Sequence, residues 1–288
     1  MIILSDFLTL APYKKRKLKN GEWIIVSRSG NPLVIDRNTL NLLKKGKVNN
    51  DLLDSLFITM LNDGGFLEGT SGNIKIPVEP HSALFRFFSI FVLLAGFISF
   101  FMVILFLYLN GLPFKSSIIF LIENPLTGLA QLIVFTTLTT VLHEIMHLIF
   151  SNRLFSKEKE LNLCFKKAVA TISMTHVWTW SLLGRMAAIL SGICLDLCIL
   201  LLLLFFPIIG VNFEVILLFQ GVLITRIAWQ FRVYSTTDIR LTLNMIRDDP
   251  FLFDNKTCHS KLILALGMGA DIFILLVWLI PTINYFRT

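Results

Sequence analysis

Hydrophobic residues dominate the chain after residue 81, where they form five long runs separated by shorter polar stretches. The runs are Leu84–Leu109, Leu126–Phe150, Leu182–Ile209, Val215–Val233 and Leu262–Pro281. Each run holds about 20 residues or more, the length at which an α-helix crosses a hydrocarbon layer about 30 Å thick. The pattern predicts a multi-pass α-helical membrane protein with about five spans.

The first 80 residues have a different pattern, in which apolar and polar positions are mixed and charges of both signs occur. Because this pattern ends near Pro77 and Pro80, we place a boundary there, between a domain over 1–80 and a membrane domain over 81–288. The first domain is predicted to be a small α/β unit. Its expected elements are strands over Glu22–Ser27 and Leu33–Ile35, a helix starting at Asp36–Thr39, and a second helix from about Asn50 to Asn62.

The composition and the placement of charge agree with a membrane location. Hydrophobic residues make up 55% of the chain, charged residues 16%, and the mean hydropathy is +0.74, values typical of integral membrane proteins. The net charge of +7 comes mainly from basic residues before the first run, between the second and third, and between the fourth and fifth. The positive-inside rule then predicts a multi-pass protein of the cell membrane with its N-terminal domain in the cytoplasm. Nucleic acid is not an expected partner, since the second predicted helix carries Asp51 and Asp54 and no arginine.

The second apolar run contains the sequence His143-Glu144-Ile145-Met146-His147. A spacing of four residues puts the two imidazoles on one helix face, where they can share a zinc ion, and Glu144 can take a proton from a zinc-bound water. Such groups are unfavourable within lipid, so a functional role is their default interpretation. The structural alternative is a buried polar network that holds helices together.

A hydrolytic zinc site needs a third protein ligand. Asp238 follows the fourth run on the cytoplasmic side and matches the depth of the histidines best. Asp271 lies midway along the fifth run. Asp196 lies about 13 residues, or roughly 20 Å, from the cytoplasmic end of the third run, which makes it too deep on this estimate.

Two further polar residues are candidates for the substrate path. His176 could line that path or contact an oxyanion, or it could be an interfacial residue beside Trp178 and Trp180. Arg226 lies near the depth of Glu144, so it could stabilise a substrate carbonyl or the developing oxyanion. It could equally form a structural ion pair with Asp271 or Asp196.

The helix with His143-Glu144-Ile145-Met146-His147, followed far downstream by Asp238, resembles the site-2 protease family of intramembrane zinc metalloproteases. In that family a Leu-Asp-Gly-type motif gives the third ligand, whereas this chain has Thr237-Asp238-Ile239. The chain is more similar to the branch found in bacterial gene clusters for modified peptides, whose third span is matched by Arg185 and Ser191-Gly192. The resemblance covers about Leu126 to Phe253 and implies zinc bound by His143, His147 and Asp238.

The first domain resembles the PqqD-like leader-peptide-recognition domains, which are small winged-helix units that bind a precursor leader by adding a strand to their sheet. The likeness runs from about Tyr13 to Glu68. The residues that carry it are Asn31–Asp36, Leu40–Lys44 and Leu61–Leu67.

Together these features predict a zinc endopeptidase that cleaves a peptide bond near the cytoplasmic membrane face, with Glu144 as the general base. The expected substrate is a ribosomally made precursor peptide or another membrane-associated peptide. One alternative is regulated cleavage of a membrane-bound regulator. Others are a metal-binding but inactive homologue, and a membrane protein that binds a modified peptide, as in immunity, without cutting it.

Overall fold

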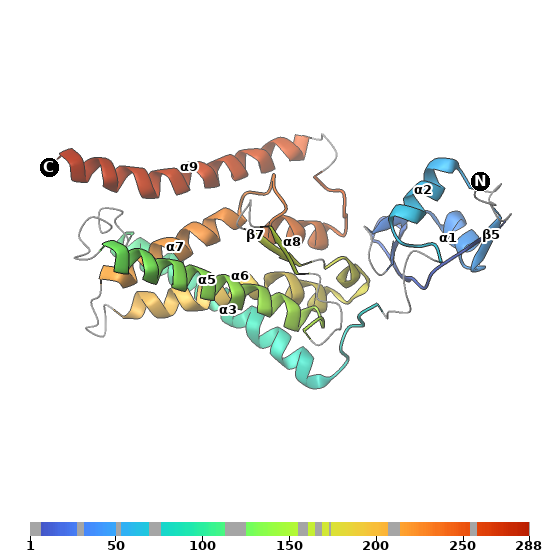
Figure 1. Cartoon of the computed structure of the whole chain (residues 1–288), viewed down its shortest axis with the longest axis horizontal. Helices are drawn as coiled ribbons and strands as arrows, with labels where there is room; N and C mark the ends of the chain where they lie inside the picture. Colours follow the sequence, from blue (N-terminus) through green and yellow to red (C-terminus); the bar gives the residue numbers. More distant parts are fainter. Residues whose placement is uncertain are drawn as a thin grey trace.

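The structure is a computed structural model, and it describes residues 7–27, 32–49, 53–68, 76–112, 125–154, 161–164, 169–172, 174–206, 214–253 and 258–287. It consists of a helical bundle with a small strand-containing unit at one end (Figure 1). The bundle is built from α3 (Ala83–Asn110), α5 (Pro125–Phe150), α6 (Leu182–Phe205), α7 (Glu214–Gln230), α8 (Asp238–Arg247) and α9 (Cys258–Arg287).

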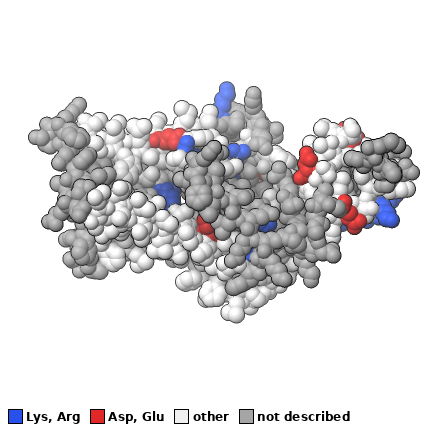
Figure 2. Space-filling view, viewed as in Figure 1, with Lys and Arg blue, Asp and Glu red and all other residues white. Residues whose placement is uncertain are grey.

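Within the described part of the chain, three helices are long and apolar enough to cross a membrane: Ala83–Asn110, Leu126–Phe150 and Leu182–Phe205. The fourth and fifth predicted runs are also helical, but their apolar stretches, Val215–Gln230 and Leu264–Ile280, are shorter. The prediction of a helical membrane protein with a small strand-containing N-terminal unit is therefore confirmed in this coarse form. On the face seen in Figure 2, the described surface of the bundle carries few charged side chains, which suits contact with lipid.

Helix α6 is the centre of the bundle and packs against α3, α5, α7 and α8. Small residues let its neighbours approach closely. At Gly96 of α3, an added Cβ would overlap the side chain of Cys194 on α6. By contrast, α9 lies along one side and contacts mainly α7 (Figure 1).

The described residues of the N-terminal unit form two small antiparallel sheets. Strand β1 (Phe7–Thr9) pairs with β5 (Lys47–Asn49), and β2 (Lys14–Lys17), β3 (Trp23–Val26) and β4 (Leu33–Ile35) form a three-stranded sheet in that order. Helix α1 (Arg37–Leu43) begins where the Asp36 carboxylate accepts hydrogen bonds from the backbone of Asn38 and Thr39, as predicted. Helix α2 (Ser55–Asp63) begins later than the predicted Asn50, because Asp54 takes the extended N-cap position; residues 50–52 lie outside the described part of the chain.

Strand β3 joins this unit to the membrane domain. Side chains alternate across a strand, so Ile25 faces the core of the N-terminal unit, with Leu40, Leu43 and Phe66. Ile24 and Val26 face the other way. They belong to an apolar cluster completed by Leu18, Phe150, Val177, Trp178, Trp180, Ala187, Ala188, Ile189 and Met245. Residues Val177 and Trp178 lie in the short 3₁₀ helix η3 (Thr175–Thr179), which precedes α6. This cluster therefore contains residues from both halves of the chain, whereas the core around Ile25 lies within the N-terminal unit. A hairpin of β6 (Leu161–Cys164) and β7 (Val169–Ile172) lies between α5 and η3.

Candidate metal centre

The end of α5 fixes the position of the two histidines. Asn152 has a left-handed backbone (φ 55°), and the N–H groups of Asn152 and Arg153 bond to the carbonyls of Ile149 and Leu148 at 3.1 and 2.9 Å. This pattern is a Schellman motif, which ends a helix and satisfies its last carbonyls. His147 consequently lies in the final turn of α5, with His143 one turn before it.

Both imidazoles are buried, with His143 6% and His147 2% exposed. Nδ1 of His143 donates to Oδ2 of Asp196 at 2.9 Å, and Nδ1 of His147 donates to the carbonyl of Ala188 at 2.8 Å. Because each Nδ1 carries the proton, each Nε2 presents a lone pair. The two Nε2 atoms lie 3.1 Å apart, an arrangement that calls for a cation between them.

Asp238 completes the cluster from a different helix. Thr237 is the N-cap of α8, Asp238 is its first residue, and the Asp238 N–H donates to Oε1 of Gln230 at 3.1 Å. The Asp238 Oδ2 atom lies 3.2 Å from Nε2 of His143 and 3.4 Å from Nε2 of His147. The structure therefore brings the three predicted ligands together within 4.8 Å.

The donor set fits a divalent metal with an open position. Ligand atoms bound at about 2.0–2.1 Å to a tetrahedral zinc ion lie about 3.3 Å from one another. The observed separations of 3.1, 3.2 and 3.4 Å are close to that value. Among the described residues, no fourth histidine, cysteine, aspartate or glutamate joins the group. Two imidazoles and one carboxylate are the ligand class of hydrolytic zinc sites, where the fourth position takes water or substrate.

Asp196 contacts Nδ1 of His143, on the side of the ring opposite the Nε2 atom that faces His147 and Asp238. It is fully buried, and Arg226 from α7 binds it through Nε (2.9 Å to Oδ2) and Nη2 (to Oδ1). The same guanidinium donates to the hydroxyls of Thr139 and Thr140 at 3.0 and 3.3 Å. Of the alternatives for Arg226, the structure has the ion pair with Asp196. The pair orients His143 as outer carboxylates commonly orient metal-binding imidazoles.

The other predicted candidates lie elsewhere. Asp271 on α9 forms an ion pair with Arg232 at 2.8 Å and accepts a hydrogen bond from the hydroxyl of Tyr234. His176 is 1% exposed and donates from Nε2 to the carbonyl of Ser151 at 2.8 Å. Burial, together with the charge of Arg153, lowers the pKa of His176 to about 3, so the ring is neutral. His176 is thus a buried residue of the short helix η3, which packs against β2 and β3 of the N-terminal unit. Neither His176 nor Asp271 belongs to the metal cluster.

A stripe on α6 forms the wall behind the histidines. Ala188, Gly192 and Asp196 are spaced by four residues and so lie on one helix face. A Cβ added at Gly192 would lie 2.5 Å from Nε2 of His143, so only glycine leaves room for the ring. The four-residue spacing is a sequence signal for this wall, although the sequence alone did not lead us to the role of Ala188. No sequence pattern indicated that the carboxamide of Gln230 accepts the hydrogen bond from the N–H of Asp238.

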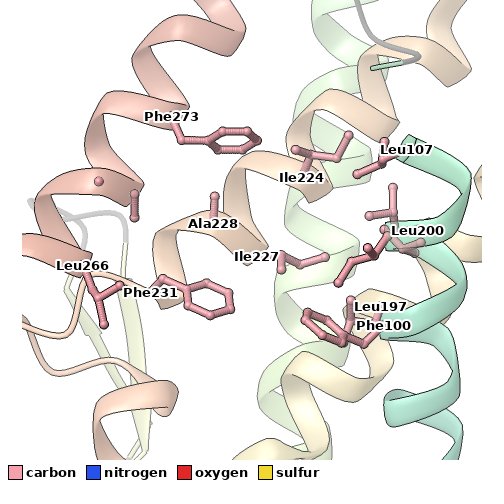
Figure 3. A pocket seen from close by; sticks show the side chains of 14 residues that line it. Phe100, Leu107, Leu197, Leu200, Ile224, Ile227, Ala228, Phe231, Leu266 and Phe273 are labelled. Carbon is pink, nitrogen blue, oxygen red and sulfur yellow. The ribbon is translucent and has the colours of Figure 1, made fainter. Parts of the chain in front are cut away.

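An apolar cavity of about 360 Å³ lies between α3, α6, α7 and α9 (Figure 3). Its lining includes Leu197, the residue after Asp196, and Phe231, the residue after Gln230. None of the three candidate ligands lines this cavity.

Comparison of the chain with models of protein families, with curated proteins and with solved structures gave no match.

Proposed function

We propose that this chain is an intramembrane zinc endopeptidase that cleaves a peptide bond near the cytoplasmic face of the cell membrane. The convergence of His143, His147 and Asp238 on one point, with Glu144 on the same helix as the histidines, supports this activity most strongly. The burial of the cluster in an apolar helical bundle supports an intramembrane reaction rather than one in open solvent.

Each residue of the centre has a part in the proposed reaction. A zinc ion held by His143, His147 and Asp238 would supply Lewis-acid activation of the scissile carbonyl and of the attacking water. Asp196 and the carbonyl of Ala188 keep both imidazoles in the tautomer that presents Nε2. Glu144 is half-buried, so its carboxylate can meet a water molecule; it accepts the proton of that water and gives it to the leaving amine.

The proposed substrate is a ribosomally made precursor peptide that matures or is exported through this cleavage. The N-terminal unit is the proposed leader-binding part, and β4 is an edge strand of its described sheet, the position from which strand addition starts. Since the unit packs against the membrane domain, a bound leader would raise the local concentration of its peptide near the centre. In the proposed topology five helices cross the membrane, and the N-terminal unit is cytoplasmic.

The test replaces Glu144 by Gln, which removes the base and keeps the shape of the side chain. The full-length protein in membranes is supplied with the precursor encoded beside its gene, and the products are measured by mass spectrometry. We expect cleavage by the wild type and by the control Glu68→Gln, which makes the same change on the exposed surface, and at least a 100-fold lower rate for Glu144→Gln. Equal cleavage by Glu144→Gln would refute the protease proposal. Stoichiometric peptide binding by a wild-type protein that neither cleaves nor holds metal would identify a peptide-binding protein instead.

A further inference from the structure

Helix α8 connects the metal centre to the N-terminal unit. Asp238 is its first residue, and Asp248, with a left-handed backbone (φ 61°), is its C-cap. Ten residues at about 1.5 Å each give a rod about 15 Å long. One carboxylate of this rod meets the histidines, and the carboxylate at its other end meets the N-terminal unit.

The side chain of Asp248 is only 3% exposed, and several hydrogen-bond donors surround its carboxylate. Arg16 of β2 binds it in a two-pronged contact, with Nη2 2.6 Å from Oδ1 and Nη1 3.0 Å from Oδ2. The backbone N–H of Lys19 adds a bond at 3.1 Å, and Arg185 of α6 adds one at 2.9 Å. A buried carboxylate with two guanidinium partners is strongly fixed, because loss of either partner leaves charge poorly compensated inside the protein.

Further contacts attach the same end of α8 to the N-terminal unit. Nζ of Lys19 donates to the carbonyl of Ile246 at 3.1 Å, where positive charge also favours the negative end of the helix dipole. The Nε atom of Arg16 donates to the carbonyl of Trp178 in η3 at 2.6 Å, a bond that holds the guanidinium itself in place. Met245 of α8 belongs to the apolar cluster that includes Ile24 and Val26 of β3. The N-terminal unit therefore supplies both polar and apolar supports for α8.

We propose that Arg16 is a positioning residue for the metal centre: acting through Asp248 and α8, the docked N-terminal unit holds Asp238 against His143 and His147. This role rests on the proposed function in one respect, that the cluster binds a metal. Movement of the N-terminal unit would loosen the third ligand. Conversely, metal binding would strengthen docking by the same factor, since coupling between two equilibria is reciprocal.

The experiment uses the full chain, purified in detergent, with Co²⁺ alone as the probe. Arg16→Gln removes the two-pronged contact, and Asp248→Asn removes the charge while keeping a residue type that tolerates the left-handed backbone. Lys15→Gln is the matched control, because Lys15 is the exposed neighbour of Arg16 on β2. Asp238→Asn gives the reference spectrum of a centre that lacks its third ligand. Size-exclusion profiles and thermal unfolding show which variants fold.

We expect Arg16→Gln and Asp248→Asn to weaken Co²⁺ binding about ten-fold, the lower range for supporting residues of metal sites. Their visible absorption should shift towards that of Asp238→Asn, whereas Lys15→Gln should match the wild type. A role in stability alone would lower the unfolding temperature without changing the spectrum of the folded protein. Wild-type affinity and spectrum in a folded variant of either kind would refute the positioning role and leave the protease proposal intact. A wild-type chain that binds neither Co²⁺ nor Zn²⁺ would refute the proposed function, and this role with it.

Discussion

Replacing Gly192 by Ala is expected to weaken metal binding strongly through a purely steric effect. The new Cβ would lie 2.5, 2.6 and 2.7 Å from three atoms of the His143 ring, whereas ordinary contacts begin at 3.4 Å. The ring or α6 must therefore move by about 0.9 Å, and metal–ligand distances tolerate only about 0.2 Å. Relaxation of such overpacking typically costs about 1–3 kcal/mol of folding free energy.

The assay measures zinc per folded protein and its loss to a competing chelator, together with the thermal unfolding temperature. For Gly192→Ala we expect at least a 100-fold weaker affinity, because one of three ligands is displaced. Gly269→Ala is the matched control: it makes the same change in an apolar helix where nothing lies within 4 Å of the new Cβ, so zinc should stay at the wild-type level. A folded Gly192→Ala protein with wild-type zinc affinity would show that His143 does not bind the metal from this position.

Three further predictions test the surroundings of the centre. Asp196→Asn weakens the hold on the Nδ1 proton of His143 and should lower zinc affinity about 10- to 100-fold in the same chelator assay, whereas Asp63→Asn on the exposed part of α2 should have no effect. Hydrogen bonds from Arg16 and Arg185 outweigh burial and lower the pKa of Asp248 to about 2 from an ordinary 3.8, so its contribution to docking is fully present above pH 3.8 and is lost as the pH falls towards 2. Hydrogen exchange of β2 and β3 at stepped pH should show this loss, and release of the strands at neutral pH would contradict it. Ile24→Ala removes a fully buried side chain from the shared core and should destabilise the full chain by about 2–4 kcal/mol in denaturant unfolding; a change under 0.5 kcal/mol would mean that β3 does not pack there.

The sequence was most informative where spacing alone determines geometry. The spacing of four residues from His143 to His147 places them on one helix face whatever surrounds the helix, so the pair could be predicted without knowledge of the fold. Asp238 followed from a depth estimate that also rejected Asp196. That estimate assumed that helix ends are level, but Asp196 is 14 residues into α6 and contacts His143, which is seven residues before the end of α5. At about 1.5 Å per residue the two ends are offset by about 10 Å, which no single-helix pattern reveals.

The N-terminal unit shows which features depend on distant parts of the chain and so could not be predicted from local sequence. Its helix start at Asp36 could be predicted from capping chemistry, because that chemistry is local. The basic run Lys14–Lys17 indicated only membrane topology, yet it forms β2, since its pairing with β3 comes from the rest of the sheet. The unbroken apolar sequence of Trp23–Val26 was consistent with a strand, but only the structure shows that both of its faces are covered.

A strand that belongs to two cores has a consequence for protein engineering. If the chain is cut between its halves, each fragment exposes the apolar surface that β3 and η3 bury against each other. Recombinant fragments should therefore aggregate rather than behave as independent domains. Chimeras that graft a foreign peptide-binding head onto this membrane body would need to exchange β3 and η3 as a pair. A substitution on one side of the contact between β3 and η3 thus limits which residues can be accommodated on the other side, so the two halves must evolve together.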